Sequence, residues 1–296
     1  MENYYLTLHT RQYKDALASI ANNKSVHSYI ISGQKGAGKL TFAKAFSAAL
    51  LCENQGCFSC SDCKRVLSLQ HPDVHLVESD KKTISVDLIR ELLEEVPISP
   101  YEGKKKIYII RNFGTATPQA QNALLKTLEE PPENVIFLLL CSQAEQLLIT
   151  IRSRCREIKL GNANADIILK QLEILFPDNP NNLKSAKECD GNIGQAIELV
   201  SSEEYWELYN YVKQILDAKS MAKCASMLED KKEEIDTILK ILENIITQRM
   251  INDKQQRVLC LRRLAAVSKA VEQMKYNVNS SLIIDLLAYS LKEGEI

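Results

Sequence analysis

Apolar and polar positions in the first half of the chain follow a pattern that predicts strands alternating with helices. Four short apolar runs predict strands, at residues 28–32, 73–79, 106–112 and 135–141. Three stretches of helical periodicity lie between or beside them, at residues 40–51, 86–96 and 118–129. The last helix must stop at Pro131 and Pro132. Alternation of this kind predicts a parallel α/β sheet, with the nearly all-apolar run 135–141 as a central strand.

The strand signal ends near Leu160, and the rest of the chain has helical periodicity. A short helical region extends to about residue 200, with breaks near Pro177, Pro180 and Gly191. Further on, apolar residues share helix faces, namely Ile238, Leu242 and Ile245, then Leu264, Val267, Val271 and Met274. Asn279 and Ser280 can cap a last helix. We expect an α/β domain over residues 1–160, a small helical domain over 161–202 and a helical domain over 203–296.

The composition is that of an ordinary globular protein without a dominant charge. Hydrophobic residues make up 45% of the chain and charged residues 25%, with a net charge of −1. Any nucleic-acid contact is therefore expected to be local or shared with partners. No stretch reaches the roughly 18 apolar residues that a membrane span needs. The nine cysteines, with no secretory signal at the start, predict reduced thiols in the cytoplasm.

A glycine-rich segment at residues 33–39 has the context of a phosphate loop, because it follows a strand and opens a helix. Gly33, Gly36 and Gly38 let backbone N–H groups point at phosphate oxygens, and Lys39 can reach the β- and γ-phosphates. The alternative is a glycine turn that binds nothing.

Two groups that ATP hydrolysis requires are replaced. The position after the lysine, which carries a Mg²⁺-binding hydroxyl in working loops, is Leu40, and the next residue, Thr41, is turned about 100° away on a helix. The strand that should end in acidic residues is followed by Arg111 and Asn112. Mg²⁺-dependent hydrolysis by this chain is therefore not expected.

A cluster of cysteines has the spacing of a metal site. Its four members are Cys52, Cys57, Cys60 and Cys63. Four thiolates suit tetrahedral Zn²⁺ and leave no open position, so a structural zinc is expected. An iron–sulfur cluster would use the same ligands, whereas a redox disulfide between Cys57 and Cys60 leaves two thiols unexplained. His71 and His75 lie near enough in sequence to be substitute ligands but are not needed.

Arg154 lies in a short motif, 150–155, after the central strand. Arginine at a domain edge can stabilise the γ-phosphate of a neighbouring subunit as an arginine finger. The alternative is a local salt bridge to Glu129 or Glu130, and chemistry alone favours that alternative.

Several segments together closely resemble the bacterial DNA polymerase III clamp-loader family of AAA+ proteins. They are NALLKTLEEPPENVIFLL at 122–139, SRC at 153–155, the cysteine knuckle and HSYIISG at 27–33. The resemblance is dense over about residues 1–200 and weaker beyond, where residues 277–291 look like the end of the family's delta-prime subunit. It implies an AAA+ P-loop parallel-sheet domain, a small helical lid and a helical C-terminal collar.

Three departures separate this chain from the family's hydrolysing gamma/tau branch. That branch has Thr after the loop lysine, an Asp-Glu pair after the next strand and a sensor arginine in the second domain. The chain has Leu40, Arg111-Asn112 and Gly194 there, as in the delta-prime branch.

The resemblance thus implies a subunit without its own ATPase activity, within a DNA-directed DNA polymerase holoenzyme. It would help to load the sliding clamp on primed DNA, in a cytoplasmic hetero-oligomer with gamma/tau and delta subunits and no membrane contact. Arg154 would act in trans on the adjacent gamma/tau site. Zinc is the implied cofactor, and binding of ATP without hydrolysis is left open.

Two further functions compete with this one. A functional ATPase, as in gamma/tau, would use Thr41 as its metal ligand. A zinc-dependent nucleic-acid binding module would rely on local basic clusters, at Lys81-Lys82, at 104–106 and at Arg152, Arg154 and Arg156. No base-stacking aromatic residues are interleaved with those clusters.

Overall fold

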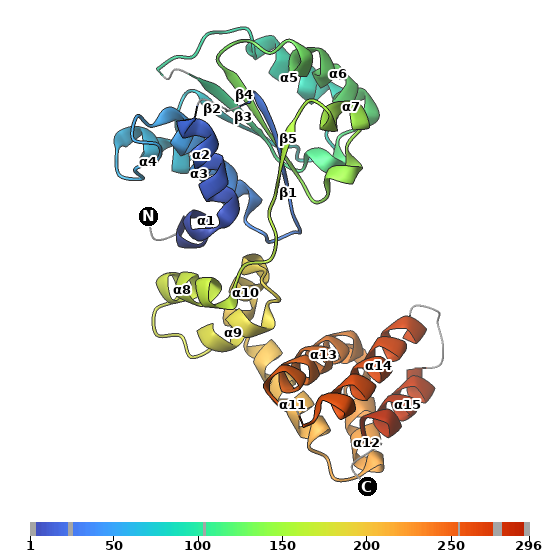
Figure 1. The fold of residues 1–296 in the computed structure, drawn as a ribbon. Coiled ribbons are helices and arrows are strands. Elements are labelled where there is room, and N and C mark those ends of the chain that lie inside the picture. Colours follow the sequence, from blue (N-terminus) through green and yellow to red (C-terminus); the bar gives the residue numbers. More distant parts are fainter. Residues whose placement is uncertain (1–3, 23–25, 103–104, 254, 275–279, 293–296) are drawn as a thin grey trace. The chain divides into compact units, whose positions relative to one another are not determined.

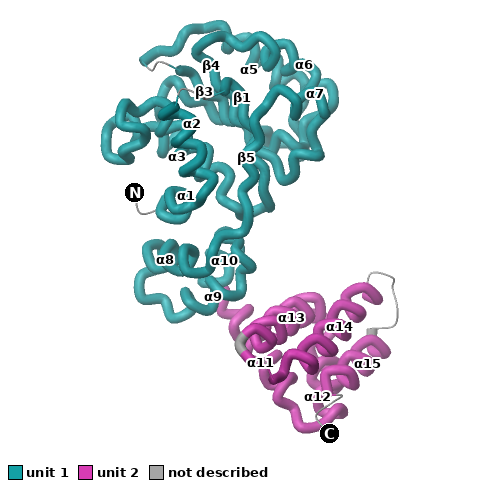
Figure 2. The backbone as a smooth tube through the Cα atoms, viewed as in Figure 1, with its two compact units in different colours: residues 1–200 teal, residues 201–296 magenta. Residues whose placement is uncertain are grey.

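The computed structural model describes residues 4–22, 26–102, 105–253, 255–274 and 280–292. The chain divides into two compact units, residues 1–200 and 201–296 (Figure 2). The predicted boundary at residue 160 lies inside the first unit, so the division into three domains stays a prediction. Asn279, a predicted helix cap, lies outside the described residues. Within the described residues, no helix combines the length and the apolar character needed to cross a membrane.

The first unit contains the predicted parallel sheet (Figure 1). Its strands are β1 (Ser28–Ser32), β2 (Val74–Val77), β3 (Lys106–Ile110), β4 (Val135–Cys141) and β5 (Arg156–Lys159). Their spatial order is β2-β3-β4-β1-β5, and every neighbouring pair is parallel. All residues of β1, β3 and β4 are buried, as a sheet covered on both faces requires. The sheet and its central strand are therefore as predicted.

Helices cover both faces of the sheet (Figure 1). One face carries α2 (Arg11–Ala21), α3 (Lys39–Leu51) and α4 (Ser61–Leu67), with α1 (Tyr5–His9) beside them. The other carries α5 (Val86–Glu95), α6 (Pro118–Glu129), α7 (Ile149–Arg152) and the short 3₁₀ turns η2 (Phe113–Thr115) and η3 (Ala144–Gln146). Ser85 and Thr117 accept N-terminal N–H groups and so fix where α5 and α6 begin.

A small helical part completes the first unit and is called the lid here. It consists of α8 (Ala165–Leu175), α9 (Asn182–Glu188) and α10 (Ile193–Val200). Its buried Gln171 accepts the backbone N–H of Leu6 at 2.9 Å, which ties the lid to α1.

The second unit is helical throughout its described residues. Its elements are α11 (Glu203–Leu216), α12 (Met221–Asp230), η4 (Lys232–Glu234), α13 (Ile235–Asn252), α14 (Arg257–Met274) and α15 (Ser280–Lys292). The predicted faces point inward, because Ile238, Leu242 and Ile245 are buried and Leu264, Val271 and Met274 pack against the same core. The buried Arg263 donates from Nε to the carbonyl of Leu291 at 2.8 Å and so joins α14 to α15.

Candidate functional site

The glycine-rich segment forms a turn between β1 and α3, as a phosphate loop does. Gly36 and Gly38 have φ of +87° and +78°, in the left-handed region that favours glycine. The ammonium group of Lys39, the first residue of α3, donates to the carbonyls of Gly33 at 2.6 Å and Gln34 at 2.8 Å. In this arrangement the lysine is bonded to its own loop. Burial lowers the pKa of Lys39.

The loop opens on a pocket of about 210 Å³ that brings together the positions singled out by sequence. Leu40 and Thr41 line it from α3, and Arg111 and Asn112 line it from the end of β3. Arg111 pairs with Glu78 at 2.9 Å. None of the described residues that line this pocket carries a carboxylate. The pocket thus offers cationic groups, and no carboxylate, where a Mg²⁺ site needs negatively charged oxygen ligands.

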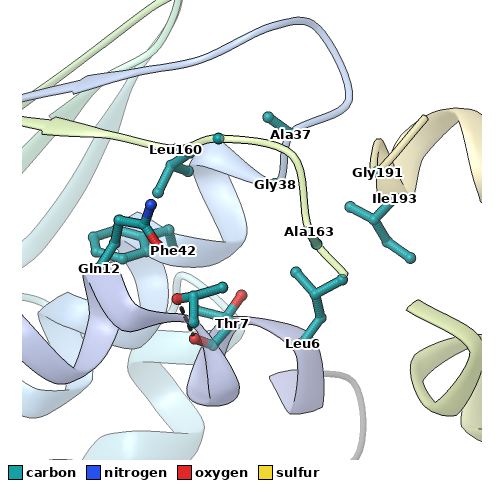
Figure 3. A pocket seen from close by; sticks show the side chains of 12 residues that line it. Leu6, Thr7, Gln12, Ala37, Gly38, Phe42, Leu160, Ala163, Gly191 and Ile193 are labelled. Atoms are coloured by element: carbon teal, nitrogen blue, oxygen red, sulfur yellow. Dashed lines mark hydrogen bonds between the residues drawn. The ribbon is translucent and has the colours of Figure 1, made fainter. Parts of the chain in front are cut away.

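A second, much smaller pocket of about 20 Å³ lies between α1, α2, α3 and the lid (Figure 3). Leu6, Phe42, Leu160 and Ile193 supply its apolar walls. A space of this size holds about one water molecule.

The lid contacts the backbone of the phosphate loop near the start of α10. Asn192 donates from Nδ2 to the carbonyl of Lys35 at 2.8 Å, and the N–H of Gly194 donates to the carbonyl of Gly36 at 2.9 Å. Asn192 also accepts the N–H of Gln195 at 3.1 Å, near the start of α10. This lid–loop contact was not predicted from the sequence.

The cysteine cluster forms as the spacing predicts. Its sulfur atoms lie 3.7 Å apart between Cys52 and Cys57, 3.9 Å between Cys52 and Cys60 and 4.0 Å between Cys57 and Cys63. Four sulfurs held about 2.3 Å from one zinc ion lie about 3.8 Å from each other. The cluster therefore has the size of a tetrahedral metal site, and all four sulfurs fall within 4.8 Å of one another.

Local hydrogen bonds favour the thiolate form at Cys57, whereas burial raises the pKa of Cys63. The N–H of Cys60 points at Cys57 Sγ, and the N–H of Cys63 at Cys60 Sγ, both at 3.4 Å. The hydroxyl and N–H of Ser59 lower the pKa of Cys57 to about 5. The donor set fits a metal ion such as Zn²⁺, which the four residues would hold without an open position.

Neither nearby histidine joins the cysteines. The buried His71 accepts the N–H of Asp73 on Nδ1 at 3.1 Å and belongs to a separate group with Asp62 and Glu102. Arg65 bonds both of those carboxylates, at 2.8 Å and 2.6 Å. The guanidinium of Arg65 therefore already supplies the positive charge in this group. The group was not predicted from the sequence.

Arg154 lies just before β5, where its guanidinium pairs with Glu129 at the end of α6, at 2.5 Å. It also donates to the carbonyl of Thr150 at 2.9 Å. The local salt bridge foreseen as an alternative is thus present in the single chain. Because β5 runs parallel to β1, Arg154 lies at the amino ends of the strands and the phosphate loop at their carboxyl ends. Four residues of strand separate the two ends by about 13 Å.

The members of the basic clusters differ in their exposure and in their bonds. Lys81 and Lys82 are exposed, whereas Lys106 is buried and donates to the carbonyl of Glu95 at 2.9 Å. Lys104 lies outside the described residues. Arg156 donates to the hydroxyl of Ser19 at 3.0 Å.

A five-stranded parallel sheet with a phosphate loop after β1 and a helical lid defines an AAA+ P-loop protein. The family model described as "DNA polymerase III, delta subunit" matches residues 8–164, more than half of the chain. The chain belongs to this family.

The chain is also similar to individual proteins. The DNA polymerase III subunit delta' of Bacillus subtilis (strain 168) is 29% identical, over 97% of both chains. The DNA polymerase III subunit gamma/tau of Mycoplasma pneumoniae is 36% identical over 52% of this chain, which spans only 23% of that relative. A DNA polymerase III gamma subunit-related protein from Thermotoga maritima is 18% identical, covers 95% of this chain and 99% of its own, and has a TM-score of 0.44.

Proposed function

We propose that the chain is a delta-prime-like, non-hydrolysing subunit of a DNA polymerase III clamp loader that supplies Arg154 to the ATP site of a neighbouring gamma/tau subunit. Its partners would be gamma/tau and delta subunits, with the sliding clamp and primed DNA met within the assembly. The α/β part, the lid and the helical second unit would correspond to the AAA+ domain, lid and collar of such a subunit.

The observation that carries this proposal is the position of Arg154. A guanidinium at the amino ends of the strands cannot serve a phosphate loop at their carboxyl ends in the same chain. A role for Arg154 in ATP hydrolysis must therefore be in trans. Its pairing with Glu129 is compatible with such a role, because a partly exposed ion pair contributes only about 0–1 kcal/mol and can exchange for a phosphate.

The residues that line the phosphate-loop pocket support the proposal that the chain has no ATPase activity of its own. Gly33, Gly36, Gly38 and Lys39 keep the form of a cradle, but Leu40 and Arg111 supply no ligand for Mg²⁺ and Asn112 carries no negative charge. The test is turnover by the isolated chain with Mg²⁺. Turnover that Lys39→Ala or Thr41→Ala abolishes would instead establish an active ATPase.

The arginine role is tested in the reconstituted loader, with Arg154→Ala and Glu129→Gln compared. Loss of a finger costs about 10³ to 10⁵ in rate at the one site served. We expect Arg154→Ala to lower DNA-stimulated ATPase activity and clamp loading, and Glu129→Gln to leave both near wild type. Equal losses in the two variants would mean that Arg154 acts only through its local salt bridge.

A further inference from the structure

A pocket of about 240 Å³ lies between the edge strand β2 and helix α5 and shares no lining residue with the phosphate-loop pocket. Two residues that line it each hold a buried polar atom without a protein partner. They are Tyr108 Oη on β3 and His75 Nε2 on β2, neither of which has a hydrogen-bond partner among the described residues. Buried polar groups in native proteins are nearly always paired, so two together point to a bound group.

The two rings are held in place by stacking. Tyr108 is only 1% exposed and lies opposite His75 in the β2–β3 register. Its ring stacks on His75 with centroids 5.0 Å apart and on Phe137 with centroids 5.6 Å apart. Burial raises the pKa of Tyr108 to about 12, and burial together with Lys106 lowers the pKa of His75. Both rings are therefore neutral near pH 7 and can accept hydrogen bonds.

The charges around the pocket are negative. Glu91 and Glu95 line it from successive turns of α5, and Glu78 lines it from the end of β2, where Arg111 pairs with it. No lysine or arginine is among the described lining residues. Lys106 lies near the Tyr108 ring, but its ammonium group donates to the carbonyl of Glu95. A positively charged ligand is thus favoured.

Four aliphatic residues complete the pocket, namely Leu76, Val77, Leu88 and Leu92. They suit the methylene groups of a long side chain whose charged end reaches the acceptors. A guanidinium matches this arrangement best, because its five N–H donors spread in one plane and it is weakly hydrated. Since β2 is an edge strand, a segment of another protein can lie beside it and insert such a side chain.

We propose that the pocket formed by His75, Tyr108, Glu91 and Glu95 binds an arginine side chain presented by a protein partner. This site does not depend on the clamp-loader role proposed above, because none of its residues takes part in that role.

The test uses the full chain with labelled histidine rings and the peptide acetyl-Gly-Arg-Gly-amide. We expect the peptide to shift the His75 ring signals in a saturable manner. The matched peptide with citrulline, which keeps the shape and loses the charge, should produce no saturable shift. No saturable shift with the arginine peptide, or equal shifts with both peptides, would overturn the proposal.

Variants locate the binding in the pocket. The double variant Glu91→Gln/Glu95→Gln should weaken peptide binding at least about tenfold, the size expected when charge-assisted hydrogen bonds are lost. Tyr108→Phe, which keeps the stacked ring, should weaken it by a smaller factor. Glu94→Gln changes an exposed carboxylate of the same helix outside the pocket and should bind like wild type. Unchanged binding in the double variant would contradict the proposal.

A free polycation is the competing ligand. If spermine binds more tightly than the arginine peptide and displaces it, the pocket is a site for a small cation. That result would overturn the proposal that a protein partner occupies the pocket. A crystal structure of the chain with the peptide, in which a water molecule and not the guanidinium bridges Tyr108 and His75, would overturn the site as a whole.

Discussion

The N–H of Gly194 donates to the carbonyl of Gly36 at 2.9 Å, and a Cβ placed on Gly194 would lie 2.5 Å from Gly36 Cα. The start of α10 and the phosphate loop thus approach so closely that neither can carry a side chain there. A side chain on Gly36 would likewise meet Asn192 Oδ1 at 2.3 Å. Because the atoms approached at Gly194 are backbone, they cannot rotate away as a side chain would. The lid–loop contact therefore depends on glycine at both positions.

We expect Gly194→Ala to separate the lid from the phosphate loop and to lower the free energy of unfolding of the first unit by about 1–3 kcal/mol, the usual cost of overpacking. Urea unfolding measures the loss, and hydrogen exchange of residues 192–200 measures the separation. Gly161→Ala is the matched control, since a Cβ at Gly161 meets no atom within 4 Å. Equal stability and equal exchange in the two variants would show that the contact is not tight.

Removal of metal should destabilise the segment around α4. We expect the purified chain to contain about one zinc ion, and Cys63→Ser to lose it, since each thiolate is one of four ligands. Metal analysis measures zinc content, and thermal unfolding with and without a chelator measures stability. Cys155→Ser changes a thiol outside the cluster and should keep the metal. Full zinc content in Cys63→Ser would contradict a four-cysteine site.

The parts of the fold that could be predicted are those whose burial leaves a pattern in the local sequence. The all-apolar β4 and the periodic α5 are examples. Strand β5 could not be predicted, because only Ile158 of its four residues is buried. Its other side chains are charged, and the strand is held mainly by backbone pairing to β1. Edge strands of this kind leave too few apolar positions to show a period.

The candidate sites could likewise be predicted only where the local sequence carries the signal. The phosphate loop and the cysteine cluster each lie within one short segment, so their spacing alone predicts them. The contact of Gly36 with Gly194 joins distant segments and has no local signal. For Arg154, the sequence left Glu129 and Glu130 as equal candidates for the salt bridge. In the structure the salt bridge is made to Glu129, the last residue of α6. The pocket of His75 and Tyr108 needs two strands in register, which the sequence does not specify.

Asp73 should be important for stability, because its fully buried carboxylate holds the segment before β3. It accepts the N–H of Tyr101 at 2.5 Å and that of Glu102 at 2.9 Å. Asp73→Ala leaves these donors unpaired, and we expect a loss of about 2–3 kcal/mol in the free energy of unfolding, as for hydrogen bonds to a charged group. Denaturant unfolding checks this value. Asp80→Ala, at an exposed position, should change stability little. A loss no larger than that of the control would show that the carboxylate does not order this segment.

The pH dependence of stability should report on His75. Burial, and then Lys106, lower its pKa below the ordinary value of 6.5, while Glu95 and Asp73 oppose the shift. The unfolded chain therefore binds a proton at this ring at higher pH than the folded chain does. The stability from the neutral ring is present above about pH 6.5 and is lost as the pH falls through the lower, folded-state value.

His75→Phe keeps the stack on Tyr108 and removes the titration. We expect its unfolding midpoint to fall less than that of the wild type between about pH 7 and pH 5. His9→Phe, at an exposed position, controls for loss of a histidine. Parallel pH profiles for the wild type and His75→Phe would mean that the ring at position 75 is as easily protonated in the folded chain as in the unfolded one.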